Sequence, residues 1–166
     1  MSVWFGADLH LGHKNICRYR SEFLSAEEHD ERIMDMLNDA VNKRGTYYLL
    51  GDIAFTLETI EMLAKLNTHN NIKIILGNHD IEGSRKISDW VNAGFRDIYA
   101  LLKYKEFWLS HAPIHPDELR GKYNIYGHTH YSKINDPRYR CVSMEQIDFK
   151  LITLEQIRGE FNRYKL

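Results

Sequence analysis

The sequence has almost no net charge, because 22 basic and 23 acidic side chains give its 166 residues a formal net charge of −1. Such a balance creates no overall field that attracts nucleic acid or a membrane surface. No apolar run approaches the length of a membrane span, and no basic stretch followed by an apolar stretch and a cleavage site stands near the first residues. We therefore expect no membrane association and no stable complex with nucleic acid.

Cysteine is also scarce, and Cys17 and Cys141 do not make a disulfide framework. Without a secretion signal, we expect both thiols to be reduced and the protein to be cytoplasmic. The sequence has no repeat at solenoid spacing, no low-complexity tract and no linker. Its hydrophobic fraction of 43% is enough for one continuous core. Residues 1–166 are therefore expected to form a single domain.

The first half of the chain alternates between strand-like and helix-like segments. Short apolar runs predict three strands, at residues 3–7, 46–50 and 72–76. Helical spacing after Ser25, Thr56 and Ser84 predicts three helices, the first stopping at Gly45. The third helix is expected to carry Ile87, Trp90 and Val91 on one face. This alternation favours right-handed crossovers and a largely parallel sheet.

The second half is richer in strands. Segments 98–104 and 107–110 predict a hairpin that turns near Lys105. Further strands are expected at residues 123–126, 140–144 and 149–152. Thr153 and Gln156 cap a last helix. The expected fold is α/β, a four-layer α/β/β/α sandwich of two mixed β-sheets flanked by helices.

Histidine is the compositional oddity, with nine residues. His29 and His69 lie in segments that look like exposed helix and loop. Five others fall at the ends of predicted strands, inside short polar clusters. In open α/β sheets, ligands bind beyond the carboxyl ends of the strands. Metal ligands or acid–base groups are therefore expected at these positions.

Five polar motifs follow predicted strands. They are, in chain order, Asp8-Leu9-His10, Gly51-Asp52, Gly77-Asn78-His79-Asp80, His111 and Gly127-His128-Thr129-His130. In an extended chain, residues two apart project the same way. We therefore expect Asp8 to project with His10, and His128 with His130. Taken singly, each motif could also be an ordinary polar turn, since Gly, Asn and Asp favour turns.

Carboxylates, an amide and imidazoles together suit Mn²⁺, Fe²⁺, Zn²⁺, Ni²⁺ or Co²⁺ rather than Ca²⁺, and this set of side chains includes no thiolate for a structural zinc. Two carboxylates gathered in one site repel by roughly 4 kcal/mol at ~4 Å and an effective dielectric near 20. Such a cluster is poor as pure structure unless cations occupy it or one carboxylate is protonated. About seven ligands suit two ions that share a carboxylate, the arrangement used for displacement at phosphorus.

The five motifs, in this order, resemble those of the calcineurin-like metallophosphoesterase superfamily, and the resemblance covers most of the chain. It implies a first metal held by Asp8, His10 and His130, a bridging Asp52, and a second metal completed by Asn78, His111 and His128. The implied cofactors are two divalent ions, Mn²⁺ first, with Fe, Zn, Ni or Co as alternatives.

The resemblance also implies the catalytic roles. In this family a hydroxide held between the metals attacks phosphorus. His79 would face the substrate, stabilise the phosphoryl oxygens and protonate the departing alkoxide. Asp80 is the candidate for orienting His79.

Two branches of the superfamily fit less well. The protein serine/threonine phosphatases carry a further Asp and an Arg after the Gly-Asp motif, whereas Ile53, Ala54 and Phe55 follow Asp52 in this chain. The nuclease branch carries an added DNA-binding domain, for which we expect no room. The segment 8–16 reads like the opening motif of small stand-alone bacterial or phage-type members.

The leading hypothesis is hydrolysis of a small phosphodiester, such as a nucleotide or cyclic nucleotide. A phosphomonoesterase acting on small molecules and a catalytically silent binding module are the alternatives. Tyr123 and Tyr126 could stack on a base, but core packing is the preferred interpretation. The candidates for gripping a substrate phosphate are His13, Lys14, Asn15, Arg18 and Arg20.

Overall fold

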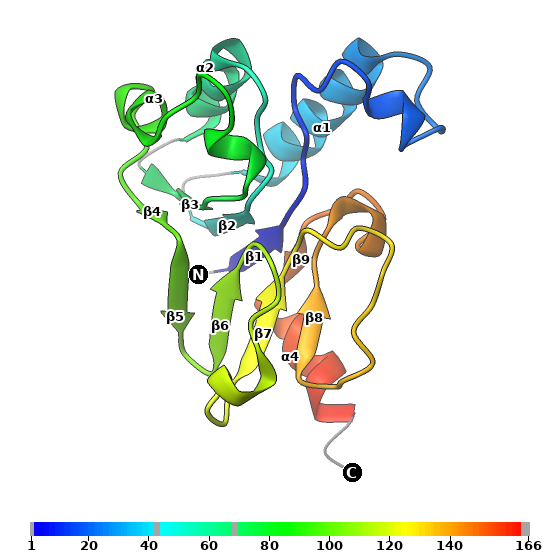
Figure 1. Cartoon of the computed structure of the whole chain (residues 1–166), viewed down its shortest axis with the longest axis vertical. Helices are drawn as coiled ribbons and strands as arrows, with labels where there is room; N and C mark the ends of the chain where they lie inside the picture. Colours follow the sequence, from blue (N-terminus) through cyan, green and yellow to red (C-terminus); the bar gives the residue numbers. More distant parts are fainter. Residues whose placement is uncertain (1, 42–43, 68–69, 164–166) are drawn as a thin grey trace.

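The computed structural model describes residues 2–41, 44–67 and 70–163, and Figure 1 shows two β-sheets with helices outside them. The first sheet has the strand order β4-β3-β2-β1-β9. Its strands are β1 (Val3–Gly6), β2 (Thr46–Leu50), β3 (Ile72–Ile75), β4 (Ile98–Tyr99) and β9 (Ile152–Thr153). Strands β1 to β4 pair in parallel and β9 pairs antiparallel to β1, so the sheet is mixed.

The second sheet has the order β5-β6-β7-β8. Its strands are β5 (Leu101–Tyr104), β6 (Phe107–Ser110), β7 (Tyr123–Tyr126) and β8 (Tyr139–Cys141). Strand β5 is antiparallel to β6, whereas β6, β7 and β8 are parallel, so this sheet is mixed as well. The predicted class of two mixed sheets flanked by helices is confirmed.

One strand boundary was predicted wrongly. Residues 98–104 do not form a single hairpin arm, because β4 belongs to the first sheet and β5 to the second. The chain crosses between the sheets at Ala100, and an apolar run gives no sign of such a change. The hairpin itself is formed by β5 and β6.

The last two predicted strands are also shifted. Strand β8 ends at Cys141, and a short helix, η5 (Met144–Gln146), follows where the strand 140–144 was expected. Strand β9 begins only at Ile152, so most of the predicted strand 149–152 is irregular. Both segments supply apolar residues to the core without extended pairing, as the buried Met144 and Leu151 show.

The α-helices of the described residues lie outside the sheets (Figure 1). They are α1 (Ala26–Ala40), α2 (Leu57–Leu66), α3 (Ile87–Asn92) and α4 (Leu154–Arg163). Helices α1, α2 and α3 cover the first sheet, and α4 packs Phe161 against Phe107 of β6 and Tyr123 of β7. Within the described ranges, none of these helices is long and apolar enough to cross a membrane.

The predicted N-caps of α1, α2 and α4 are confirmed. The hydroxyl of Ser25 accepts from the N–H of Glu28 at 3.1 Å, and Thr153 and Gln156 cap α4 reciprocally. Helix α1 ends at Ala40, well before Gly45, because Val41 turns to an extended conformation. These caps satisfy N–H groups that the first turn of a helix leaves without partners.

Helix α3 differs more from expectation. It begins at Ile87, after Lys86, and not at Ser84. Ile87 and Val91 are 50% and 55% exposed, and of the three residues expected on its apolar face only Trp90 is buried. A helix of six residues is too short to bury a full stripe, so one large side chain supplies its contact with the core.

The core is continuous between the two sheets. Phe5, Leu49 and Ile74 of the first sheet lie in the same buried cluster as Leu109 and Ile125 of the second. Tyr126 is 1% exposed. The ring of Tyr123 packs against that of Phe161 at a tilt, with the centroids 4.4 Å apart. The core-packing interpretation of both tyrosines is therefore confirmed.

Strand direction positions the polar motifs. The parallel strands β1, β2 and β3 bring their carboxyl ends to one edge, and β6 and β7 do the same in the second sheet. The loops after these strands are joined by backbone hydrogen bonds, from Asp8 N–H to Gly51 O and from Gly127 N–H to His111 O. All five motifs therefore meet where the two sheets adjoin.

Candidate metal centre

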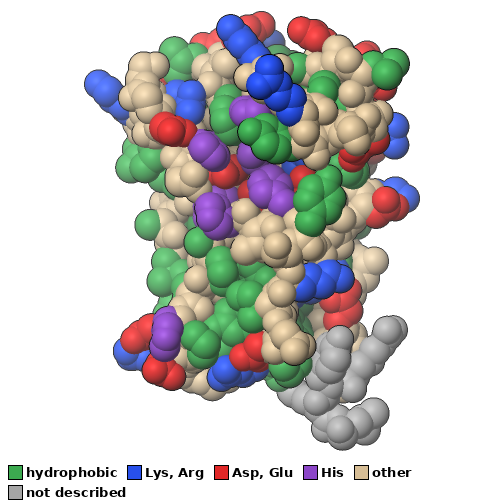
Figure 2. Space-filling view, turned by 45° about the vertical axis from the view of Figure 1, so that its right-hand side comes forward, with side chains coloured by type: hydrophobic (Ala, Val, Ile, Leu, Met, Phe, Trp, Pro, Cys, Tyr) green, Lys and Arg blue, Asp and Glu red, His purple; other side chains and the backbone are tan. Residues whose placement is uncertain are grey.

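Histidine side chains gather on one face of the molecule, at the level where the two sheets meet (Figure 2). They form two adjacent groups with carboxylates. One group contains Asp8, His10 and His130, and the other contains Asp52, His111 and His128. Within each group the potential ligand atoms all lie within 4.8 Å of one another.

The first group centres on Oδ1 of Asp8. This oxygen lies 4.0 Å from Nε2 of His10 and 3.9 Å from Nε2 of His130. In the second group, Nε2 of His111 lies 3.1 Å from Nδ1 of His128. Each group therefore presents one carboxylate and two imidazoles to a common point, a donor set that suits a borderline divalent ion.

Asp52 faces both groups. Its Oδ2 lies 3.9 Å from Nε2 of His10, and its Oδ1 lies 3.3 Å from Nε2 of His111. The amide oxygen of Asn78 lies 3.1 Å from the same nitrogen of His111. One carboxylate with an oxygen toward each group has the geometry of a bridge between two ions.

The backbone that carries these residues is not extended. Positive φ angles occur at Asp8 (57°), His10 (55°), Asp52 (50°), His128 (70°) and His130 (49°). The chain is therefore not extended at either pair, although Asp8 and His10 do lie in the same group as expected. His128 and His130 were expected to project together, but they belong to different groups. Such conformations cost of order 1–3 kcal/mol each and persist where surrounding structure imposes them, typically at functional sites.

Close packing explains why a glycine precedes both Asp52 and Asn78. A Cβ at Gly51, whose φ is +82°, would lie 2.3 Å from Nδ1 of His111. A Cβ at Gly77 would lie 2.3 Å from the backbone nitrogen of Asp52. Side chains at these positions would push the loops apart, so the close approach of the two groups requires glycine.

Hydrogen-bond partners assign the tautomer of two histidines. Nδ1 of His111 lies 2.9 Å from the carbonyl oxygen of Leu50, which only accepts, so Nδ1 carries the proton. Nδ1 of His130 lies 3.0 Å from Oε1 of Glu145 and donates likewise. In both neutral rings the Nε2 lone pair then points into the site, as in metal-binding histidines.

Several buried atoms of the site lack partners. Among the described residues, Oδ1 of Asp8 and Nε2 of His10 are buried without a hydrogen bond. Burial, with the charge of Arg20 second, lowers the pKa of His10 to about 2, so the ring is neutral and offers a lone pair. Buried groups without partners are costly, and lone pairs that converge on one point repel. A cation between them would remove both penalties, so the residues fit a metal.

The charges support the same conclusion. Burial opposes ionisation of Asp52, but the hydrogen bond and charge of His111 lower the pKa of that carboxyl to about 2. Burial lowers the pKa of His111, yet Asp52 outweighs it and the pKa is raised. A proton on His111 and a cation beside Asp52 therefore compete for the same place.

Glu145 supports the first group, and sequence reasoning missed it. Its Oε1 accepts from Nδ1 of His130 and, at 2.8 Å, from Nε of Arg20. Burial raises the pKa of Glu145, but these two partners lower it to about 2. Ser143 adds a hydrogen bond of 2.5 Å to Oδ2 of Asp8. No motif marks either residue, because both follow the predicted ligands in the sequence by many positions.

Arg20 is not a free side chain on the surface, as a residue that grips a phosphate was expected to be. It is completely buried and donates to the carbonyl oxygens of Asp8 and Leu9 at 2.5 and 3.3 Å. It also lies 2.8 Å from Nε2 of His29. His29, expected to be exposed, is completely buried with it, and His69 lies outside the described residues. Arg20 therefore supports the loop that carries Asp8.

A cavity of about 450 Å³ opens beside the first group. It is lined by His10, His13, Ile16, Tyr19, Arg20, His79, His130, Tyr131 and Glu145. Of the remaining predicted substrate residues, His13 lines this cavity, whereas Lys14, Asn15 and Arg18 are exposed on the loop beside it. A role for these four in binding phosphate stays a prediction.

Asp80 does not contact His79, so its proposed role in orienting that ring was wrong. Its carboxylate is buried and accepts from the backbone N–H groups of Gly77, Ile53 and Ala54 at 2.8, 2.7 and 3.2 Å. Adjacent residues point apart here, and the side chain of Asp80 is used to hold the loops after β2 and β3 together.

Glu82 takes the position beside His79. Its Oε2 lies 2.5 Å from Nδ1 of His79, while Nε2 of that ring lies 4.0 Å from Oδ2 of Asp52. The ring of Phe55 packs against the imidazole with centroids 5.1 Å apart. Arg85 donates to the carbonyl oxygens of both His79 and Phe55. Glu82 and Phe55 thus hold the ring with Nε2 toward Asp52, and Arg85 fixes the backbone that carries both rings.

The sequence profile of the calcineurin-like phosphoesterases matches residues 1–163. The chain therefore belongs to the calcineurin-like phosphoesterase family. The two groups of potential metal ligands lie within the matched residues.

Relatives add context but no activity. The chain is 37% identical over 82 residues to the Gene 66 protein of Mycobacterium phage L5, and 33% identical over 82 residues to that of Mycobacterium phage D29. Each match covers 48% of this chain and 40% of the phage protein. A solved protein of unknown function from Aquifex aeolicus is 23% identical, with a TM-score of 0.71 over 95% of this chain and 98% of the other. That likeness shows the shared fold.

Proposed function

We propose that this protein hydrolyses a P–O ester bond with the help of two divalent ions, and that its substrate is a small phosphodiester such as a nucleotide or cyclic nucleotide. The observation that carries the proposal is the position of Asp52, with one oxygen toward each group of histidines. Oδ1 of Asp52 also accepts a hydrogen bond from the N–H of His79 at 3.0 Å, and a carboxylate held in this position suits a ligand shared by two ions.

In this proposal Asp8, His10 and His130 hold the first ion, Asn78, His111 and His128 hold the second, and Asp52 contacts both. Mn²⁺ is the proposed metal, because oxygen and imidazole donors suit it and no thiolate takes part. Two ions bound there would supply positive charge for the phosphoryl oxygens and would lower the pKa of water.

His79 is the proposed general acid. Its Nδ1 is held by Glu82, so a proton on Nε2 faces the site and can pass to the departing alkoxide oxygen. Glu82 is the proposed positioning residue, in place of the Asp that protein phosphatases carry after the Gly-Asp motif. Phe55 packs against this ring with the centroids 5.1 Å apart and so restricts its rotation.

The cavity favours a diester over a monoester. A phosphomonoester carries one more negative charge than a diester near neutral pH and benefits from a free cationic side chain. Among the described residues that line the cavity, the only lysine or arginine is Arg20. Its guanidinium is buried and already paired with Glu145, so it is not free to bind a phosphate. A silent binding module would have no need for His79 and its support, so this alternative is less well founded.

A comparison of hydrolysis rates tests the proposal. Chelator-treated protein should be inactive, and added Mn²⁺ should restore hydrolysis. Linear diesters and cyclic nucleotides should then be hydrolysed faster than monoesters that share the same leaving group. Activity that is indifferent to chelation would contradict the proposal, and a preference for monoesters would establish the phosphomonoesterase instead.

A further inference from the structure

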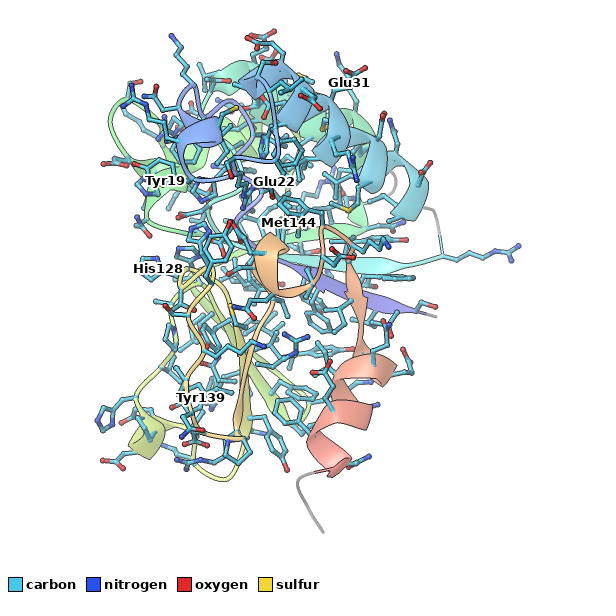
Figure 3. The ribbon with its side chains drawn as sticks, turned by 90° about the vertical axis from the view of Figure 1, so that its right-hand side faces the viewer. Tyr19, Glu22, Glu31, His128, Tyr139 and Met144 are labelled. Atoms are coloured by element: carbon cyan, nitrogen blue, oxygen red, sulfur yellow. The ribbon has the colours of Figure 1, made fainter. Side chains whose placement is uncertain are left out.

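Two exposed tyrosines stand at the rim of the cavity beside the first group. Tyr19 is 68% exposed and Tyr131 is 64% exposed, although both line the cavity. They come from segments 112 positions apart, and the hydroxyl of Tyr131 donates to the carbonyl oxygen of Tyr19 at 3.3 Å. Figure 3 shows Tyr19 on the same side of the molecule as His128.

These tyrosines lie next to the potential metal ligands. Tyr131 directly follows His130 in the chain. The ring of Tyr19 lies 6.0 Å from that of His13, which in turn lies 5.7 Å from the ring of His10. A phosphoryl group held at the first group would therefore direct one of its organic substituents toward the two phenol rings.

The lining of the cavity also restricts that substituent. The charged side chains in the lining, Arg20 and Glu145, are paired with each other and nearly inaccessible. No free cation is therefore found among the described residues that line it, so the cavity offers little to a second phosphate. It offers rings and an aliphatic wall at Ile16, a surface that suits a flat uncharged group.

Exposed aromatic rings at a rim have one evident use. Large apolar side chains in contact with water gain free energy when a ligand covers them, and every nucleobase has a flat face that stacks on an aromatic ring. A volume of about 450 Å³ also lies within the usual range for sites that bind small molecules.

We propose that Tyr19 and Tyr131 form a stacking subsite for the aromatic part of the phosphoester, a nucleobase. The subsite rests on the proposed function, since the metal groups must hold the phosphate. It makes the two tyrosines the residues that select nucleotides over phosphoesters of simple alcohols and sugars.

The test compares two ligands that differ only in the base. Adenosine 5′-monophosphate and ribose 5-phosphate are titrated into Mn²⁺-loaded protein by calorimetry. The nucleotide should bind about 5- to 150-fold more tightly, the range that one stacked base supplies. In the double variant Tyr19→Leu with Tyr131→Leu the two dissociation constants should become nearly equal, because the Kd of the nucleotide rises and that of the sugar phosphate does not.

Two further variants make the result specific. Tyr131→Phe keeps the ring and should keep the preference for the nucleotide. Leu24→Ala removes a side chain that is 92% exposed and lies outside the cavity lining, so it should leave both constants unchanged. Circular dichroism establishes that the leucine variants are folded, which their exposed positions favour.

The outcomes separate the two proposals. Equal affinities in the wild-type protein, no measurable binding of the nucleotide, or a preference that survives the double leucine substitution would overturn the subsite. Metal-dependent hydrolysis of bis(4-nitrophenyl) phosphate is measured on the same preparations. If this hydrolysis is absent and the protein still prefers the nucleotide, the proposed function is overturned and the subsite is supported.

Discussion

Replacement of Arg20 by methionine should destabilise the protein strongly. The guanidinium is completely buried and bonds to Glu145, to the nitrogen of His29, and to the carbonyl oxygens of Asp8 and Leu9. The side chain of Glu145 is itself only 3% exposed. Methionine has a similar length and no charge, so the substitution leaves a buried carboxylate and two carbonyl groups without their main partner.

The expected magnitude follows from that geometry. Removing one partner of a buried ion pair costs about 3–5 kcal/mol. For a protein of this size, 1 kcal/mol shifts the Tm by about 2–4 °C, so the Tm of metal-free protein should fall by about 6–20 °C. Thermal unfolding followed by circular dichroism measures the change.

Arg18→Met is the matched control. Arg18 is two positions away, carries the same charge and is exposed, so its loss should change stability by no more than about 0.5 kcal/mol. A Tm within about 2 °C of wild type for Arg20→Met, together with a raised KM, would refute the structural role and restore Arg20 as a substrate-binding residue. Adding Glu145→Gln to Arg20→Met should lower the Tm by less than the sum of the single effects, because it removes the stranded charge.

Three other substitutions test the site. His79→Ala should keep bound metal but lower turnover by about 10²–10⁴ on substrates with poor leaving groups. Glu82→Gln should lower turnover on the same substrates but change it little on substrates with a good leaving group. In the double variant, Glu82→Gln should add almost no further loss of turnover to that of His79→Ala. Independent, multiplicative losses in steady-state kinetics would show that Glu82 does not act through His79. Asp52→Asn should loosen both ions together, and elemental analysis that still returned two tightly held ions per chain would rule out a shared ligand.

Much of the fold could be predicted because local signals and tertiary structure agree. The β-branched run before Gly77 became a buried strand, and hydroxyl caps at Ser25 and Thr56 began helices where expected. Predictions failed where an apolar run does not reveal its partner, as at Ala100, where the chain changes sheets. That residues 1–166 form a single domain, and that the protein is cytoplasmic, stay predictions.

The site was predictable to the extent that its residues follow strands. Carboxyl ends of parallel strands meet at one edge, so Asp8, Asp52 and His111 were expected together and do lie together. Their roles as metal ligands stay predictions. The left-handed backbone at Asp8 was not expected, because residue spacing alone gives no φ angle.

The supporting residues escaped prediction for a different reason. Glu82, Glu145 and the buried Arg20 act through contacts that depend on how distant loops fold back, and none of the three stands in a motif. The positive charge of Arg20, near a predicted metal ligand, suggested a contact with substrate, whereas its burial shows that the side chain supports the structure. Exposure decides between these two interpretations, and a single sequence does not reveal it.

In the proposed function, Asp52 joins two metal positions into one centre. The most direct test is titration of metal-free protein with Mn²⁺, followed by elemental analysis and electron paramagnetic resonance. We expect two ions per chain and the spectrum of a magnetically coupled pair, since a shared carboxylate would hold the ions about 3.5–4 Å apart. One ion per chain, or two ions with the spectrum of isolated Mn²⁺, would contradict it.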